Sequence, residues 1–141
     1  MMEAFQLSHQ WATHIVSLLD PDIGIGNTIR IPVASQDSLQ RCYYFHDITP
    51  NQLGDGWLKN AKVATLEQIQ DILAFTASLQ SSNKLLVHCH AGISRSTATA
   101  CGILCQHGLT PQEAVKYVLS IRKQAFPNQY ILALFDNALN L

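Results

Sequence analysis

The sequence lacks the features that mark membrane-spanning and exported proteins. No apolar stretch approaches the roughly 20 residues with which a helix crosses a bilayer. Residues 1–10 contain no basic segment followed by an apolar run, so we do not expect them to form a signal peptide. These absences predict a cytoplasmic protein without a membrane segment.

Charge is scarce and almost balanced. Charged residues make up 13% of the chain, and the formal net charge is −1. This argues against a basic surface of the kind that binds nucleic acids or anionic membranes without specificity, so neither is expected as a partner. A single pocket can nevertheless be positive, because net charge describes only the whole chain.

Cysteine is also rare. The chain has no pair of cysteines separated by two residues and only four in all: Cys42, Cys89, Cys101 and Cys105. This is too few for the disulfide scaffold of a small secreted protein, and it predicts thiols in a reducing compartment.

The chain does have enough apolar residues for one core. Its 141 residues are 48% apolar, and they contain no repeat, low-complexity tract or linker. Because this length is near the commonest for a single domain, we predict one domain over residues 1–141. The oligomeric state is not predicted.

Strands are predicted mainly in the first half of the chain. The runs with strand composition are His14–Leu19, Thr28–Val33, Arg41–Ile48 and Leu85–Val87. The last run is apolar throughout, which predicts a central strand covered on both faces. Residues 49–56 hold a proline and two glycines and are predicted to form a loop.

Helices are predicted mainly in the second half. Apolar residues recur at steps of three and four over residues 63–79, which indicates an amphipathic helix of nearly five turns. A second helix over residues 95–107 should end at Gly108 in a left-handed cap. Strands early and helices late, with a strand–loop–helix unit between them, indicate an α/β fold.

Two further helices are predicted near the C-terminus. Residues 110–113 (TPQE) form a capping box with proline at the first helical position, and the helix they open should run to about Lys123. Arg122 and Lys123 are expected to complement the dipole of that helix. Residues 126–128 (FPN) break it, and a last helix runs to the C-terminus.

The most informative stretch is residues 88–96, HCHAGISRS, between the apolar strand and the second helix. Five residues separate Cys89 from Arg95, and a loop of that length can curl so that its backbone N–H groups converge on one point. The helix N-terminus adds partial positive charge there, and Gly92 permits a positive φ. Because Arg95 can hold two oxygens of a tetrahedral anion, the stretch predicts a phosphate cradle with a sulfur at its base.

The same electric field should stabilise a thiolate. Cysteines at helix N-termini or beside cations have lowered pKa values, so we expect Cys89 to be ionised at neutral pH. A thiolate in line with a bound phosphorus can displace the ester oxygen and form a phosphocysteine that water then hydrolyses. Ser96 is expected to donate a hydrogen bond to the sulfur, and His88 to order the loop rather than transfer protons.

This stretch resembles the protein tyrosine phosphatase signature, HCxxGxxR followed by Ser or Thr, and is most similar to the dual-specificity branch. The resemblance implies an α/β fold with a central mixed sheet, helices on both sides and no metal cofactor. It also implies that Cys89 is the nucleophile and that Asp47, which lies at the end of a predicted strand in the pattern YFHDxxP, is the general acid. The phosphate binders it implies are the Arg95 side chain and the backbone of His90, Ala91, Gly92, Ile93, Ser94 and Arg95.

The substrate remains open at this point. The chain has no equivalent of the phosphotyrosine-recognition loop of the large tyrosine phosphatases, and its signature lacks the lysines of phosphoinositide phosphatases. Phosphotyrosine proteins are the first expectation, with phosphoserine and phosphothreonine as further candidates. The alternatives are a small phosphomonoester (a nucleotide, an RNA 5′ end or an inositol phosphate) and a phosphate-binding module without catalysis.

Other interpretations of single residues also stay open. Asp55 competes with Asp47 as the acid, since it lies nearer to Cys89 in sequence but between two glycines. His88, Cys89 and His90 resemble metal ligands, but Cys101 and Cys105 lie two to three turns into the following helix, too far away to share a metal with them. We expect these two cysteines to be core thiols.

Overall fold

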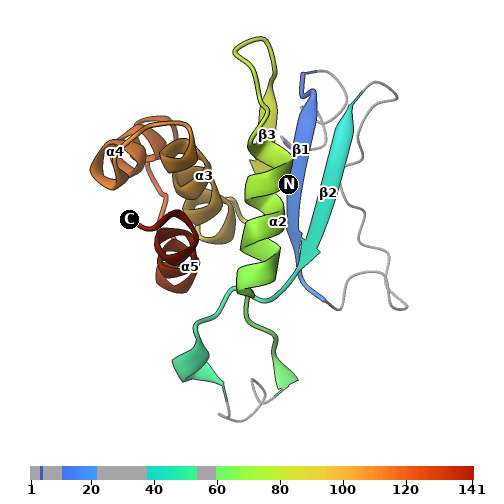
Figure 1. The fold of residues 1–141 in the computed structure, drawn as a ribbon. Helices are drawn as coiled ribbons and strands as arrows, with labels where there is room; N and C mark the ends of the chain where they lie inside the picture. Colours follow the sequence, from blue (N-terminus) through green and yellow to red (C-terminus); the bar gives the residue numbers. More distant parts are fainter. Residues whose placement is uncertain (1–3, 5–10, 22–37, 54–59) are drawn as a thin grey trace.

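The computed structural model describes residue 4 and residues 11–21, 38–53 and 60–141 (Figure 1). Three strands form a sheet of order β2-β1-β3, and both strand pairs are parallel. They are β1 (His14–Leu19), β2 (Leu39–Tyr44) and β3 (Leu85–His88). Because the strands are parallel, their carboxyl ends meet at one edge of the sheet, from which Asp20, Phe45 and Cys89 continue.

Strand β1 lies at the centre and is buried on both faces. Val16 and Leu18 point towards the helices, and Ile15, Ser17 and Leu19 on the opposite face are buried as well. A strand covered on both sides needs apolar residues at nearly every position, and in β1 Ser17 alone interrupts the apolar run of residues 15–19.

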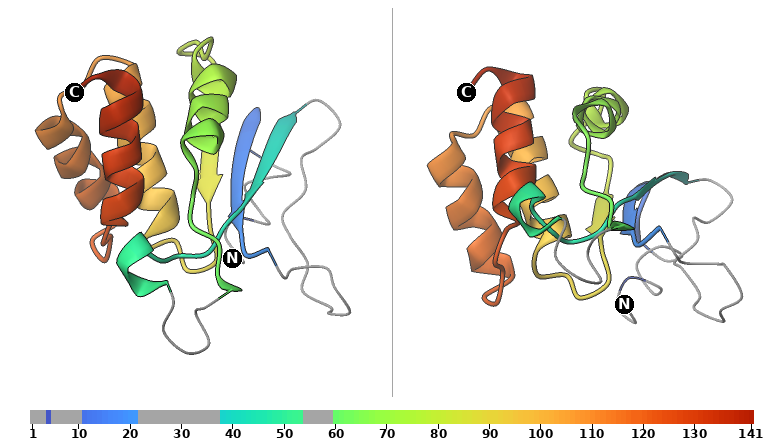
Figure 2. Two further views of the ribbon diagram at one scale, coloured as in Figure 1. Left: turned by 60° about the horizontal axis from the view of Figure 1, so that its bottom comes forward. Right: turned by 90° about the horizontal axis from the view of Figure 1, so that it is seen from below.

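Four described helices accompany the sheet: α2 (Leu66–Thr76), α3 (Arg95–Gln106), α4 (Pro111–Ile121) and α5 (Gln129–Leu139). Figure 2 shows α3 next to the sheet and α4 beyond it, with α5 alongside α3 and α2. A common core joins one face of the sheet to α2, α3 and α5; its largest buried members are Phe45, Phe135, Leu18, Ile69, Ile72 and Ile131. Among the described residues, no helix is long and apolar enough to span a membrane.

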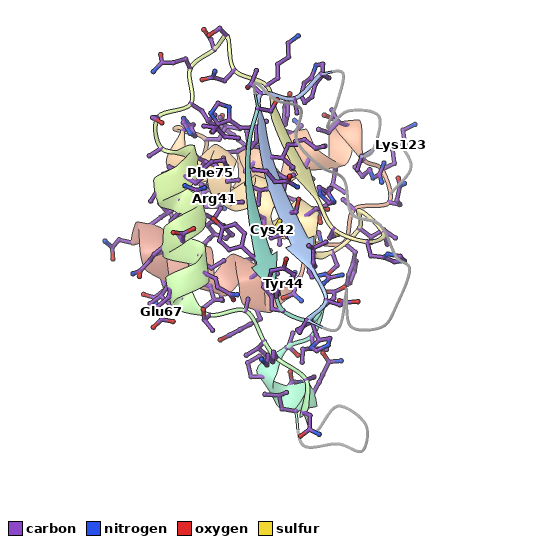
Figure 3. The ribbon with its side chains drawn as sticks, turned by 90° about the vertical axis from the view of Figure 1, so that its right-hand side faces the viewer. Arg41, Cys42, Tyr44, Glu67, Phe75 and Lys123 are labelled. Atoms are coloured by element: carbon purple, nitrogen blue, oxygen red, sulfur yellow. The ribbon has the colours of Figure 1, made fainter. Side chains whose placement is uncertain are left out.

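Helix α2 is tied to β2 by polar contacts as well as by the core. The Tyr43 hydroxyl donates to Asp71 Oδ2 at 2.6 Å. The Arg41 guanidinium lies 5.1 Å from the centre of the Phe75 ring, and Figure 3 shows the two side chains meeting between strand and helix. These contacts hold the strand that leads to Asp47 against the body of the protein.

The predicted helix ends are largely confirmed. Thr110 caps α4 in a capping box with Glu113, and Asn128 caps α5. Gly108 has φ +110° directly after the end of α3, as expected for a left-handed cap.

Helix α2 is shorter than predicted. It has 11 residues: it begins directly after Thr65, which forms a capping box with Gln68, so Val63 lies outside it, and it ends at Thr76 rather than at residue 79. Apolar spacing reported which side chains face the core, whereas the cap determines where the helical backbone begins.

The strand predictions are correct in kind but not in every boundary. The bounds of β1 are as predicted, whereas β2 lies two residues earlier at its start and ends at Tyr44, so residues 45–48 continue as loop and lead to a 3₁₀ turn at Pro50–Gln52. Among the described strands β3 pairs with β1 alone, and it is half-buried over Leu85–Val87, so the cover seen in the described residues is less complete than predicted. The predicted strand at 28–33 lies outside the described residues.

Candidate active site

The site begins with the loop of residues 89–94 that joins β3 to α3, here called the Cys89 loop. Gly92 has φ +69°, which confirms the predicted left-handed conformation in this loop. A Cβ atom at this position would also lie 2.4 Å from Arg122 Nη2. The positive φ requires glycine here, whereas the contact with the end of the flexible Arg122 side chain could be relieved by a shift of that side chain.

Cys89 lies at the base of the loop and is only 4% exposed. Its Sγ is 3.2 Å from Ser96 Oγ, and the Gly92 N–H donates to it at 3.3 Å. Burial by itself would raise the pKa of the Cys89 thiol. The hydrogen bonds from Ser96 and Gly92, together with the charge of Arg95, outweigh this effect and lower that pKa below its ordinary value.

The Ser96 contact gives a first prediction. Because this hydroxyl favours the thiolate, Ser96→Ala should raise the pKa of Cys89 and move the rise of iodoacetamide inactivation rate with pH to higher pH. Ser120→Ala is the matched control, since the Ser120 hydroxyl donates to the Tyr117 carbonyl within α4. An unchanged inflection in Ser96→Ala would show that the hydroxyl does not hold the thiolate.

The carbonyl groups of the Cys89 loop are turned towards the connection between α4 and α5. Arg122 Nε donates to the Gly92 carbonyl at 3.1 Å, the Phe126 N–H to that of Ile93 at 2.8 Å, and the Asn128 N–H to that of Ser94 at 3.1 Å. In a trans peptide the carbonyl and the following N–H point in opposite directions. The connection therefore turns the N–H groups of residues 93–95 away from itself.

The loop is left with several unused donors. Within the described part of the chain, the backbone N–H groups of His90, Ala91, Ile93, Ser94 and Arg95 donate no hydrogen bond. The N-terminus of the 12-residue helix α3 begins at the same point and adds its partial positive charge. Such a cluster of N–H groups at a helix N-terminus can bind an anion.

Arg95 supplies the charge of this anion site. Its side chain is 6% exposed, and Nη1 donates to Asp20 Oδ1 at 2.8 Å and to the Phe45 carbonyl at 2.9 Å. Its Nε is buried and has no partner in the described structure. Since a buried donor without a partner is costly, this edge of the guanidinium is suited to a ligand oxygen.

Asp20 is a site residue that the sequence reasoning missed. It follows β1 directly and binds one end of the Arg95 guanidinium, which fixes the orientation of the other end. The two residues are 75 positions apart. The sequence contains one signal, an acidic residue at the carboxyl end of a buried strand, but residues 20–22 (DPD) equally have the composition of a turn.

His88 stands behind the loop and is buried. Its Nε2 lies 2.7 Å from Ser17 Oγ, to which Gln40 Nε2 also donates, so the three strands are linked by polar groups. Desolvation lowers the pKa of His88 to about 4, so the ring is neutral at physiological pH. A neutral, hydrogen-bonded ring fits the expected ordering role better than proton transfer.

Asp47 reaches the Cys89 loop from the end of the β2 segment. Its Oδ1 accepts hydrogen bonds from Ser94 Oγ at 2.8 Å and from Asn128 Nδ2 at 2.9 Å. The neighbouring His46 is engaged elsewhere, since its Nδ1 accepts from the Lys62 N–H at 2.9 Å. The structure thus brings Asp47 to the loop, whereas the competing Asp55 lies outside the described residues.

Cys101 and Cys105 are not part of this site. Cys101 and Cys105 pack in a second apolar cluster with α4, and burial raises the pKa of Cys101 to about 11. This confirms them as core thiols. Over the described ranges, no group of three or more His, Cys, Asp or Glu side chains is placed to hold a metal ion.

Arg122 differs from its prediction. It is the C-cap residue of α4, but its guanidinium reaches the Gly92 carbonyl of the Cys89 loop. Its position near the end of a helix predicts that its charge stabilises the helix dipole. In the folded chain, however, the Cys89 loop lies within reach of the Arg122 side chain.

Comparison with known proteins agrees with this architecture. The crystal structure of human DUSP28 matches with a TM-score of 0.66 and 19% identity, over 99% of this chain and 85% of that one. The human tyrosine phosphatase-like serine/threonine/tyrosine-interacting protein matches with a TM-score of 0.63 and 20% identity, over 92% and 77%. PTPMT1 in complex with PI(5)P matches with a TM-score of 0.60 and 16% identity, over 89% and 75%.

These identities establish the fold alone, a parallel sheet flanked by helices as in the protein tyrosine phosphatases. No curated protein sequence matches the chain. The family described as "Dual specificity phosphatase, catalytic domain", however, matches residues 26–138, which include the whole Cys89 loop and Asp47. The chain therefore belongs to the dual specificity phosphatase family, a branch of the cysteine-based protein tyrosine phosphatase superfamily.

Proposed function

We propose that the protein hydrolyses phosphomonoesters with Cys89 as nucleophile, and that its substrates are phosphotyrosine proteins, with phosphoserine and phosphothreonine as further substrates. One observation carries the proposal. A sulfur whose pKa is lowered lies at the base of a loop whose N–H groups, together with the buried Nε of Arg95, have no acceptor among the described residues. Such an arrangement is suited to bind a tetrahedral anion above a nucleophile.

The proposed reaction has two steps. The Cys89 thiolate attacks phosphorus, an S–P bond forms, the P–O bond to the substrate breaks, and Asp47 gives its proton to the departing oxygen. A water molecule then attacks the phosphorus of the phosphocysteine and gives a proton to Asp47. The S–P bond breaks and the Cys89 thiolate is restored. Ser96 stabilises the sulfur as it leaves, and Arg95 with the loop N–H groups binds the phosphoryl oxygens in both steps.

An apolar side chain in the loop itself supports an aryl phosphate as substrate. Ile93 is 37% exposed. Large exposed apolar groups next to a polar site provide a surface on which a tyrosine ring can pack. Within the Cys89 loop and its first helical residue, Arg95 is the only Lys or Arg, which is less suited to a substrate with several phosphates.

A panel of phosphate esters tests the proposal. We expect hydrolysis of para-nitrophenyl phosphate and of a phosphotyrosine peptide, slower release from a phosphoserine peptide, and no loss of activity in chelator. Faster hydrolysis of PI(5)P, which is bound in the PTPMT1 structure, would replace the protein substrate by a lipid. Tungstate binding without any turnover would indicate a phosphate-binding module, and activity restored by zinc or magnesium after chelation would contradict the thiolate mechanism.

A further inference from the structure

Asn128 has a fixed orientation. It caps α5, is 7% exposed, and its Oδ1 accepts the Ile131 N–H at 3.0 Å. Its Nδ2 donates to Asp47 Oδ1 at 2.9 Å and to the Ile48 carbonyl at 3.2 Å. A carboxylate and a carbonyl can only accept, and the N–H of Ile131 can only donate, so the amide cannot be reversed without losing all three bonds.

Asn128 also contacts the Cys89 loop. Its backbone N–H donates to the Ser94 carbonyl at 3.1 Å, while the Ser94 hydroxyl donates to Asp47 Oδ1 at 2.8 Å. Asn128, Ser94 and Asp47 therefore form a closed triangle of hydrogen bonds that joins α5, the Cys89 loop and the end of the β2 segment. Asn128 and Asp47 are 81 residues apart in the sequence. They meet because α5 fixes the position of the Asn128 side chain that caps it.

The triangle determines which oxygen of Asp47 is available. Both donors bind Oδ1, so Oδ2 is the oxygen left to carry a proton. The Asp47 side chain is otherwise exposed, and an exposed carboxylate on a loop would sample several rotamers. Two donors on one oxygen limit that freedom before any substrate binds.

We propose that Asn128 is a positioning residue that holds Asp47 against the Cys89 loop with Oδ2 directed to the departing oxygen. This rests on the proposed function and adds to it the residue that orients the acid. Asn128 itself touches neither substrate nor sulfur. It acts through Asp47, whose Oδ2 proton moves to the leaving oxygen as the S–P bond forms and the P–O bond breaks.

Asn128→Ser separates this role from capping, because serine caps a helix about as well as asparagine but has no amide donor for Asp47. We expect its kcat to fall about 10- to 100-fold on a phosphotyrosine peptide, part of the about 10²–10⁴-fold that a general acid contributes. On para-nitrophenyl phosphate, whose phenolate is the weaker base and leaves more readily without a proton, the loss should be no more than about threefold by the same argument. The tungstate-induced rise in melting temperature should persist, since the loop and Arg95 are unchanged.

A double-mutant cycle gives the decisive test. If Asn128 acts only through Asp47, adding Asn128→Ser to Asp47→Asn should change the rate by less than about twofold. Thr110→Ala is the matched control: it removes the N-cap of α4 and should lower the melting temperature without any dependence on the leaving group. Asn128→Thr, which also keeps a cap acceptor and lacks the amide donor, replaces Asn128→Ser if that variant does not fold.

The outcomes separate the two proposals. Two results with an active wild type would overturn the positioning role and leave the proposed function intact. In the first, Asn128→Ser slows the hydrolysis of both substrates equally. In the second, Asn128→Ser slows Asp47→Asn by the same factor by which it slows the wild type. A folded wild type without turnover on any ester overturns the proposed function, and the positioning role falls with it.

Discussion

Cys89→Ser should lower the hydrolysis of para-nitrophenyl phosphate at least about 100-fold while tungstate still raises the melting temperature. The hydroxyl has a far higher pKa than the thiol, so the hydrogen bonds and charge that lower the pKa of Cys89 do not ionise it. The hydrogen-bond donors that would bind the anion remain, because the positions of the backbone N–H groups and of Arg95 do not depend on the sulfur. Initial rates and thermal melting with and without tungstate measure the two effects separately.

Two other variants make this result specific. Cys42→Ser changes a half-buried thiol on β2 and should retain activity (Figure 3). Arg95→Ala should abolish the tungstate effect, because it removes the charge and the unpartnered Nε of the anion site. An enzyme that loses its nucleophile should retain less than about a hundredth of the wild-type rate. A higher rate in Cys89→Ser would refute Cys89 as the nucleophile.

The part of the site that the sequence predicted is the part built by neighbouring residues. Cys89, Gly92, Arg95 and Ser96 lie within eight positions, and a loop that enters a helix brings such residues together whatever the rest of the chain does. The positive φ of Gly92 and the lowered pKa of Cys89 both follow from that local geometry. Such local geometry can be predicted from neighbouring residues without knowledge of the tertiary structure.

The residues that the sequence did not reveal act over long separations. Asp20 reaches Arg95 across 75 positions, and Asn128 reaches Asp47 across 81. Each has an ordinary local explanation, a turn for Asp20 and a helix cap for Asn128, and nothing in its neighbours indicates a second partner. Such contacts depend on the order of strands in the sheet and on the packing of α5, which spacing along the chain does not encode.

The position of a strand within the sheet could not be predicted for a related reason. The run Leu85–Val87 is apolar throughout, yet among the described strands β3 pairs with β1 alone and is only half-buried. Apolar content indicates how much of a strand is covered, but not which elements cover it. Helix α3 contacts β3 and supplies part of that cover.

Asp47→Asn should slow hydrolysis of a phosphotyrosine peptide about 10²- to 10⁴-fold, the usual contribution of a general acid. The tyrosine oxygen has a pKa of about 10 and departs poorly without a proton. The amide keeps the shape of the carboxyl group but has no proton to give. The decline of the wild-type rate at high pH, which reports loss of the proton from the acid, should flatten in the variant; kcat measured across pH tests this.

The dependence on the leaving group decides whether Asp47 or Asp55 is the acid. A general acid matters most when the departing oxygen is a strong base, so the defect of Asp47→Asn should shrink as the phenolate becomes a weaker base, while a merely structural defect would slow all esters alike. Asp47 is bound to the loop through Ser94 and Asn128, which supports it over the residue nearer in sequence. If Asp55→Asn shows the dependence on the leaving group and Asp47→Asn behaves like wild type, then Asp55 is the acid, and the triangle of Asn128, Ser94 and Asp47 braces the Cys89 loop without taking part in proton transfer.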